Sequence, residues 1–208
     1  MTSPSELAGP GASLTDPVER VAAAIRAHNI EAIVVDTGAD AREVVLALIP
    51  DGAEVHSGKS KTLEDIGLHA ELMDSERYDF VRKQTMAMDR TTNGRQIRKL
   101  TTGPDFMLGS VSAITEDGAL VAASGTGSQL AGYAAGAGRL ILIVGSQKIV
   151  PDLDAALRRI DEVAFPYEDE QVMARLGVHT ILEKLLVIYG EWTAGRTTVV
   201  LVREPVGV

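Results

Sequence analysis

The chain has 208 residues and a formal net charge of −9, with 45% hydrophobic and 24% charged residues. This balance suits a soluble globular protein with a sizeable core, and the negative charge argues against nonspecific binding to nucleic acid or an anionic membrane. The chain has no cysteine, which excludes disulfides, thiolate zinc sites and cysteine-ligated iron–sulfur clusters of its own. Without cysteine for a cluster, we expect no cofactor of its own. No apolar run reaches membrane-spanning length, so we expect a cytoplasmic protein.

Residues 1–15 are rich in Pro, Gly and Ser, which predicts a disordered lead-in rather than a signal peptide. Residues 16–208 are expected to form one domain, because no linker-like composition interrupts them. Asp16 and Pro17 are a typical cap and first residue for a helix to about His28. The runs that follow predict strands over 31–36 and 53–58, helices over 40–49 and from Thr62, and a mostly helical 74–100 with a break at 91–94.

The second half of the chain is richer in small and β-forming residues. Asp117-Gly118 predicts a hairpin turn between two short strands. Further runs predict strands at 140–146, 184–190 and 197–204, the last two around a turn, and a helix from 151 to about 163. Strands that alternate with helices indicate an α/β fold. We expect a mainly parallel sheet flanked by helices, with an antiparallel portion near 110–123.

Residues 124–129 read S-G-T-G-S-Q and lie between a predicted strand and a predicted helix. Gly125 and Gly127 would let a ligand approach the backbone, and Thr126 and Gln129 have the spacing of a helix capping box. Free N–H groups at a helix start, with Ser128 beside them, suit a phosphate or a carboxylate. The missing third glycine excludes a dinucleotide fingerprint. Two interpretations stay open, an anion site or a turn that merely needs glycine.

Two more loops follow predicted strands. The first contains Gly58, Lys59, Ser60 and Thr62, and its glycine spacing excludes a P-loop. Ligand crevices of open α/β sheets lie at such strand ends, although exposed lysines in a polar loop are the plainer interpretation. The second loop contains Gln147 and Lys148, and Lys148 could supply the countercharge for an anion held at 125–129.

Glu116 precedes the predicted hairpin turn, where a carboxylate could act as a base or as a nucleophile toward an acyl group. A solvated turn residue is the alternative. His56 ends a predicted strand and is either a packing residue or a catalytic one. The four histidines lack metal-ligand spacing, so no metal site is expected.

The segments 57–68, S-G-K-S-K-T-L-E-D-I-G-L, and 109–157 together resemble the lactate-utilisation (LUD) domain family, of the LutC/YkgG type. The resemblance implies a fold like those of ribose-5-phosphate isomerase and coenzyme A transferases. It also implies a role in the oxidation of L-lactate to pyruvate, with iron–sulfur protein subunits as partners. Self-association into a homo-oligomer is left open. The coenzyme A transferase kinship adds weight to Glu116, because those enzymes use a Glu at a strand end.

This resemblance supports three hypotheses. The first is a binding protein for a small anionic metabolite, the second a self-contained isomerase- or transferase-like enzyme that uses Glu116, and the third a scaffold subunit. One segment departs from the LutC pattern. Where that pattern has T-A-D-I-E and then G-V-H-G-P, this chain has T-I-L-E-K at 180–184 and E-W-T-A-G at 191–195.

Overall fold

A computed structural model of the chain describes residues 16–208, so the predicted lead-in at 1–15 lies outside the described residues. The helical elements of the described part are α1 (Pro17–Ala27), α2 (Gly38–Leu48), α3 (Lys61–Asp65), α4 (Leu68–Asp74), α5 (Val81–Met86), α6 (Arg90–Thr102), the π-helix η2 (Gly132–Gly136), the 3-10 turn η3 (Ser146–Lys148), α7 (Leu153–Arg159), the π-helix η4 (Ile160–Ala164) and α8 (Phe165–Leu176). The strands are β1 (Glu31–Val35), β2 (Glu54–Ser57), β3 (Asp79–Phe80), β4 (Phe106–Gly109), β5 (Ala113–Thr115), β6 (Leu120–Ser124), β7 (Arg139–Gly145), β8 (Ile149–Val150), β9 (Lys184–Ile188) and β10 (Thr197–Val202).

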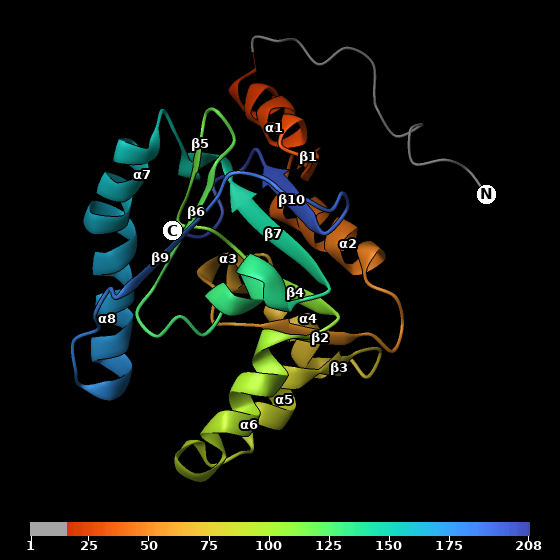
Figure 1. The fold of residues 1–208 in the computed structure, drawn as a ribbon, viewed down its shortest axis with the longest axis vertical. Coiled ribbons are helices and arrows are strands. Elements are labelled where there is room, and N and C mark those ends of the chain that lie inside the picture. Colours follow the sequence, from red (N-terminus) through yellow and green to blue (C-terminus); the bar gives the residue numbers. More distant parts are fainter. Residues whose placement is uncertain (1–15) are drawn as a thin grey trace.

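The larger sheet, sheet A, has six strands in the order β1-β10-β7-β4-β2-β3, and every neighbouring pair is parallel. Near the centre of the sheet, Val199 of β10 is paired with Ala32 of β1 on one side and with Leu142 of β7 on the other. Strands β7 and β10 form the middle of the molecule (Figure 1). Their nearly unbroken apolar sequences follow from burial on both faces. The expected mainly parallel sheet is confirmed.

The smaller sheet, sheet B, has the order β8-β5-β6-β9 and contains the expected antiparallel portion. Strands β5 and β6 form a hairpin, and the Gly118 N–H donates to the carbonyl of Thr115 in its turn (2.9 Å). Gly118 has a φ of 92°, which a glycine adopts without strain. Strand β9 adds to β6 in antiparallel fashion, and the two stretches that depart from the LutC pattern, 180–184 and 191–195, lie at either end of it.

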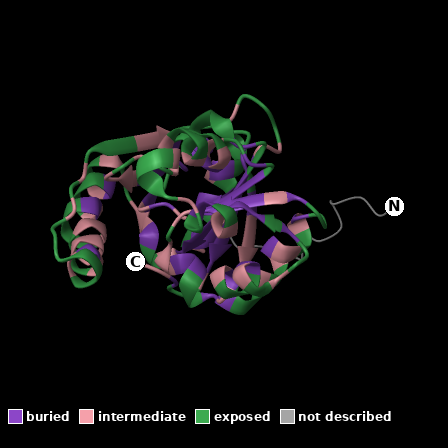
Figure 2. Ribbon diagram, turned by 90° about the horizontal axis from the view of Figure 1, so that it is seen from below, coloured by how far each residue is buried: buried purple, intermediate pink, exposed green. Residues whose placement is uncertain are grey.

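Three hydrophobic clusters hold these layers together. Helices α2, α3 and α4 cover one face of sheet A, with Val45, Leu63 and Leu72 in their shared core. Helix α1, η2 and one face of sheet B cover the other. The second face of sheet B packs against α7 and η4 through Ala156 and Ile160. Figure 2 shows the strands as the buried centre and the outer helices with exposed faces.

Four local predictions need correction. The 91–94 segment lies inside α6, because Asp89 caps that helix and the break comes at 87–89. The strands at 184–188 and 197–202 do not pair with each other, since they belong to different sheets. The helix expected over 151–163 continues through η4 into α8. Helix α3 begins at Lys61, because the hydroxyl of Ser60 caps it. No helix among residues 16–208 is long and apolar enough to cross a membrane.

Candidate functional site

At the carboxyl edge of sheet A, two neighbouring strands send the chain to opposite faces. After β2 the chain enters α3, which packs on the face covered by α2 and α4. After β4 it enters β5, which packs with sheet B on the other face. Open α/β sheets bind ligands in the crevice that forms at such a switch point. The residues that follow β2, β4 and β7 therefore define the candidate site.

Lys148 lies at this switch point and is only 3% exposed. Its ammonium donates to the hydroxyl of Thr62 (2.9 Å), which follows β2. It also donates to the hydroxyl of Ser110 (3.0 Å) and the carbonyl of Val111 (3.3 Å), which both follow β4. Three segments that are far apart in the sequence therefore meet on one amine.

The Lys148 amine is buried among neutral oxygen atoms. None of the ion pairs in residues 16–208 includes it. Burial, and to a lesser degree the charge of Arg159, lowers the pKa of Lys148 to about 7, while Asp65 acts in the opposite direction. A buried cation without a counter-ion is stabilised by an anion beside it. In its neutral form the same amine can accept a proton.

A short segment after β10 covers the Lys148 amine. Gly207 packs so closely that a Cβ there would collide with Thr62 and lie 3.1 Å from the Lys148 Nζ. The Gly207 N–H donates to the carboxylate of Asp65 (3.1 Å). Gln147 donates to the carbonyl of Val206 (2.8 Å). The predicted ligand residue Gln147 therefore holds this covering segment in place.

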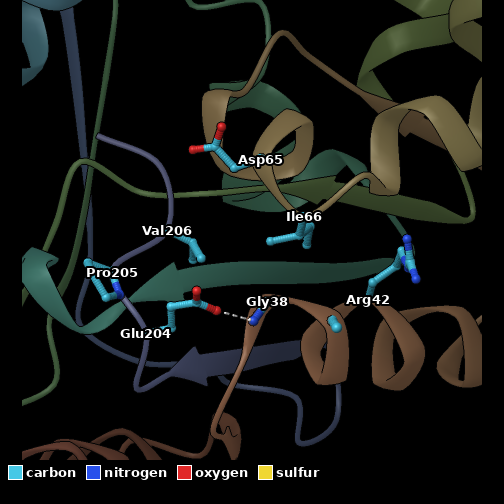
Figure 3. A pocket seen from close by; sticks show the side chains of 8 residues that line it. Gly38, Arg42, Asp65, Ile66, Glu204, Pro205 and Val206 are labelled. Atoms are coloured by element: carbon cyan, nitrogen blue, oxygen red, sulfur yellow. Dashed lines mark hydrogen bonds between the residues drawn. The ribbon is translucent and has the colours of Figure 1, made fainter.

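A cavity of about 420 Å³ lies beside this cover, between α2, the end of α3 and residues 204–206 (Figure 3). The carboxylate of Glu204 points into it and accepts a hydrogen bond from the N–H of Gly38 (2.9 Å), at the start of α2. Arg42 lines the cavity from the same helix. An anion that binds at this helix start has to displace Glu204, whereas no such competitor pairs with Lys148 in the described residues.

The 124–129 loop satisfies much of its own polar backbone. The Gly127 N–H donates to the hydroxyl of Ser124 (2.9 Å), and the Ser128 N–H to that of Thr126 (3.4 Å). The side-chain oxygen of Gln129 accepts from the hydroxyls of Ser124 and Ser128. The helical turn starts only at Leu130, so the expected capping box between Thr126 and Gln129 does not form.

The glycines of this loop have a packing explanation. A Cβ at Gly125 would lie 2.5 Å from the carbonyl oxygen of Ile181. One at Gly127, whose φ is +78°, would lie 2.5 Å from the Lys184 side chain. Both contacts are to residues 180–184, the segment that departs from the LutC pattern. The loop geometry thus favours the turn interpretation, and anion binding by this loop stays a prediction.

The remaining predicted ligand residues lie at the end of β2. Gly58 lies next to the 124–129 loop, since a Cβ added there would lie 3.8 Å from the Cβ of Gln129. Lys59 lies 3.9 Å from the carboxylate of Glu168 on α8. The hydroxyl of Ser60 caps α3 at the Leu63 N–H. Of the predicted set, the structure brings Thr62 into contact with Lys148 and places Gly58 next to Gln129.

Glu116 lies at the opposite end of β5 from the Lys148 contacts. Its N–H donates to the carbonyl of Val150 (2.8 Å), and its side chain is exposed. The adjoining turn packs on α1, where the ring of His28 bonds the carbonyl of Asp117 (2.9 Å). The structure does not bring Glu116 together with Lys148, and its catalytic role stays a prediction. No cluster of metal-ligating side chains is found among residues 16–208.

Ser110 and Val111 are site residues that the sequence interpretation missed. They directly follow the short strand β4, whose sequence F-M-L-G is ambiguous on its own. In the sequence, the only sign of a site here is a glycine followed by a serine at the end of this short strand. These residues lie at the site because β4 lies between β2 and β7, and only the structure supplies that strand order.

Comparisons with known proteins bear on the family and the fold of the chain. The family model described as the LUD domain matches residues 18–202. A search of curated proteins gave no match. A DUF162 family protein from Deinococcus radiodurans is similar with a TM-score of 0.50 and 13% identity, over 92% of this chain and 99% of that chain. Ribose 5 phosphate isomerase A from Neisseria gonorrhoeae has a TM-score of 0.34 and 12% identity, over 79% of this chain and 74% of that one. At this identity, the first likeness shows a shared fold.

Proposed function

Because this chain belongs to the LUD domain family, we propose that it is a LutC-type protein of lactate utilisation that binds a small anionic metabolite beside Lys148. The metabolite is a carboxylate or a phosphate, with L-lactate and pyruvate as the first candidates. The observation that carries the proposal is the buried Lys148 amine, which bonds three neutral oxygens and has no carboxylate partner.

The chemistry of the site supports an anion. When Lys148 is protonated, an anion adds a counter-ion in a place shielded from water, where the attraction is strong. Thr62 and Ser110 hydroxyls can turn to donate to the same anion, because a hydroxyl both donates and accepts. The amine of Lys148, with its pKa near 7, is also suited to moving a proton to or from a bound hydroxy acid.

Access to the amine requires the cover to move. Residues 204–207 are held by hydrogen bonds from Gln147 and to Asp65 and by the contact of Glu204 with α2. Val206 of this segment also packs into the core on the α2 face. Opening of the segment alone leaves the rest of the core in place, so it costs less than global unfolding. We propose that the anion enters when this segment opens.

A thermal-shift series with L-lactate, pyruvate and inorganic phosphate tests the proposal. A ligand at a hundredfold excess over its Kd adds about 2.7 kcal/mol of stability to the state that binds it. For a domain of this size that corresponds to a rise in Tm of roughly 5–10 °C. The Lys148→Met variant should lose the rise, while Lys99→Met, which removes a surface charge from α6, should keep it. An equal rise in the Lys148→Met variant contradicts the proposal.

Iron–sulfur partner subunits belong to the same proposal, because the chain has no cysteine for a cluster. A tagged chain expressed in cells grown on lactate should co-purify with a cysteine-rich iron–sulfur protein. If the chain purifies without any such protein, the proposed iron–sulfur partner is contradicted. The proposed metabolite site is tested separately, by the thermal shifts.

A further inference from the structure

The cavity between α2, the end of α3 and residues 204–206 is not used by the proposed metabolite site. Its volume of about 420 Å³ suits a small metabolite, since ligand pockets are typically about 300–1,000 Å³. Ile66 and Val206 line it with buried apolar side chains. Gly38 lets both close on α2, because a Cβ there would lie 2.8 Å from Ile66 and 3.3 Å from Val206. Three separate segments therefore build the cavity by close packing.

Opposite charges line the two ends of this cavity (Figure 3). The carboxylate of Glu204 lies at the start of α2, and Arg42 comes four residues further along that helix than the N–H that Glu204 accepts, which is about 6 Å. In the described part of the chain, the two side chains form no ion pair with each other or with another residue. Asp65 differs, because its carboxylate pairs with Lys61 and accepts from the Gly207 N–H.

Both unpaired groups are held in position before a ligand arrives. The guanidinium of Arg42 rests against the backbone between α3 and α4, since a Cβ at Gly67 would lie 3.2 Å from its Nη1. One carboxylate oxygen of Glu204 accepts from the Gly38 N–H (2.9 Å), and within residues 16–208 its other oxygen accepts no hydrogen bond. The cavity thus presents one fixed carboxylate and one fixed guanidinium.

We infer that this cavity binds a small aliphatic α-amino acid, with the ammonium at Glu204 and the carboxylate at Arg42. A simple anion is repelled by Glu204 and a simple cation by Arg42, whereas a zwitterion carries both charges on neighbouring carbon atoms and satisfies both residues. A guanidinium presents parallel N–H donors that fit the two oxygens of a carboxylate. Ile66, Pro205 and Val206 offer apolar surface to the aliphatic side chain.

The wall that residues 204–206 give to this cavity is also part of the cover of Lys148. An amino acid that bridges Glu204 and Arg42 ties the covering segment to α2 in its closed position. A ligand that binds one state better than another shifts the equilibrium toward that state. The amino acid should therefore oppose entry of the metabolite at Lys148, a consequence that rests on the proposed function. Binding in the cavity itself does not depend on Lys148.

Isothermal titration with L-leucine, L-alanine and two leucine analogues tests the site. 4-Methylpentanoate lacks the ammonium and leucinamide lacks the carboxylate. Each should bind at least tenfold more weakly than L-leucine, as expected for one lost charge-assisted hydrogen bond. If neither amino acid binds, or if either analogue binds as tightly as L-leucine, the inference is overturned.

Variants locate the binding in the cavity. Arg42→Gln and Glu204→Gln should each weaken amino-acid binding at least tenfold, and the amide oxygen of the second variant can still accept from the Gly38 N–H. Glu43→Gln, an exposed change on α2 outside the cavity lining, is the matched control and should bind as the wild type does. Wild-type affinity in both cavity variants contradicts binding at this place.

Hydrogen exchange tests the effect on the cover without relying on the proposed metabolite. The Gly207 N–H donates to Asp65, so it exchanges when the covering segment opens. Its exchange should slow when L-leucine saturates the protein, and an unchanged rate overturns the closing of the cover. Both the binding and the slowing should survive in Lys148→Met, the variant expected to lose its response to L-lactate and pyruvate. A failure of the proposed metabolite site is thereby distinguished from a failure of the amino-acid site.

Discussion

At the residue scale, Lys148 differs from an ordinary lysine because the fold removes it from water. Its three hydrogen bonds go to oxygens of Thr62 in α3 and of Ser110 and Val111 after β4, and none of these oxygens carries a charge. Burial therefore dominates its pKa, with Arg159 acting in the same direction. A lysine in this position costs stability when it is protonated, which is typical of a residue kept for function rather than for folding.

The cost of Lys148 predicts a pH dependence of stability. In the unfolded chain the amine holds its proton up to the ordinary pKa of 10.5, whereas in the folded protein it loses the proton near pH 7. Between these values the unfolded state binds more protons, so the contribution of Lys148 to the free energy of unfolding rises with pH. Denaturant titrations at several pH values should show the wild type gaining stability relative to Lys148→Met from pH 7 upward. A constant difference between the two proteins would show that Lys148 titrates normally.

At the element scale, the glycines of the 124–129 loop resemble ligand-binding residues in the sequence, but close packing against residues 180–184 explains why they are glycines. Gly125 is needed because the carbonyl of Ile181 lies where its side chain would be. In β5, Ile114 packs into the core cluster against sheet A, and its neighbour Ala113 packs into the cluster against α7 and η4. The β5–β6 hairpin is therefore held between two layers. The hairpin itself was predictable, because Asp117-Gly118 is a local signal.

A pair of glycine substitutions tests this view of the 124–129 loop. Gly125→Ala should reduce the free energy of unfolding by about 1–3 kcal/mol, because a Cβ 2.5 Å from a backbone oxygen forces the loop or β9 to shift. Gly58→Ala is the matched control and should change stability little, since the nearest atom to its Cβ would lie at 3.8 Å. If Gly125→Ala is as stable as the wild type yet loses anion binding, the loop is a ligand site after all.

At the scale of the whole molecule, the sequence was sufficient for the fold class and not for the site. Apolar runs such as 140–146 predict strands locally, and their alternation with helices predicts the parallel sheet. The order of the six strands depends on long-range packing, and the contact of Thr62 with Lys148 follows from that order. The prediction of Glu116 rests on its turn and on the coenzyme A transferase kinship, and the residue lies at the other end of β5 from the Lys148 contacts.

The most direct test of the central claim is the pKa of Lys148 itself, measured by NMR on lysine-labelled protein with and without L-lactate or pyruvate. The structure predicts a pKa of about 7 for the free protein. An anion beside the amine favours the protonated form, so the pKa of Lys148 should rise when the metabolite binds. A Lys148 pKa near 10.5 in the free protein, or one that neither metabolite changes, would contradict an anion site at this lysine.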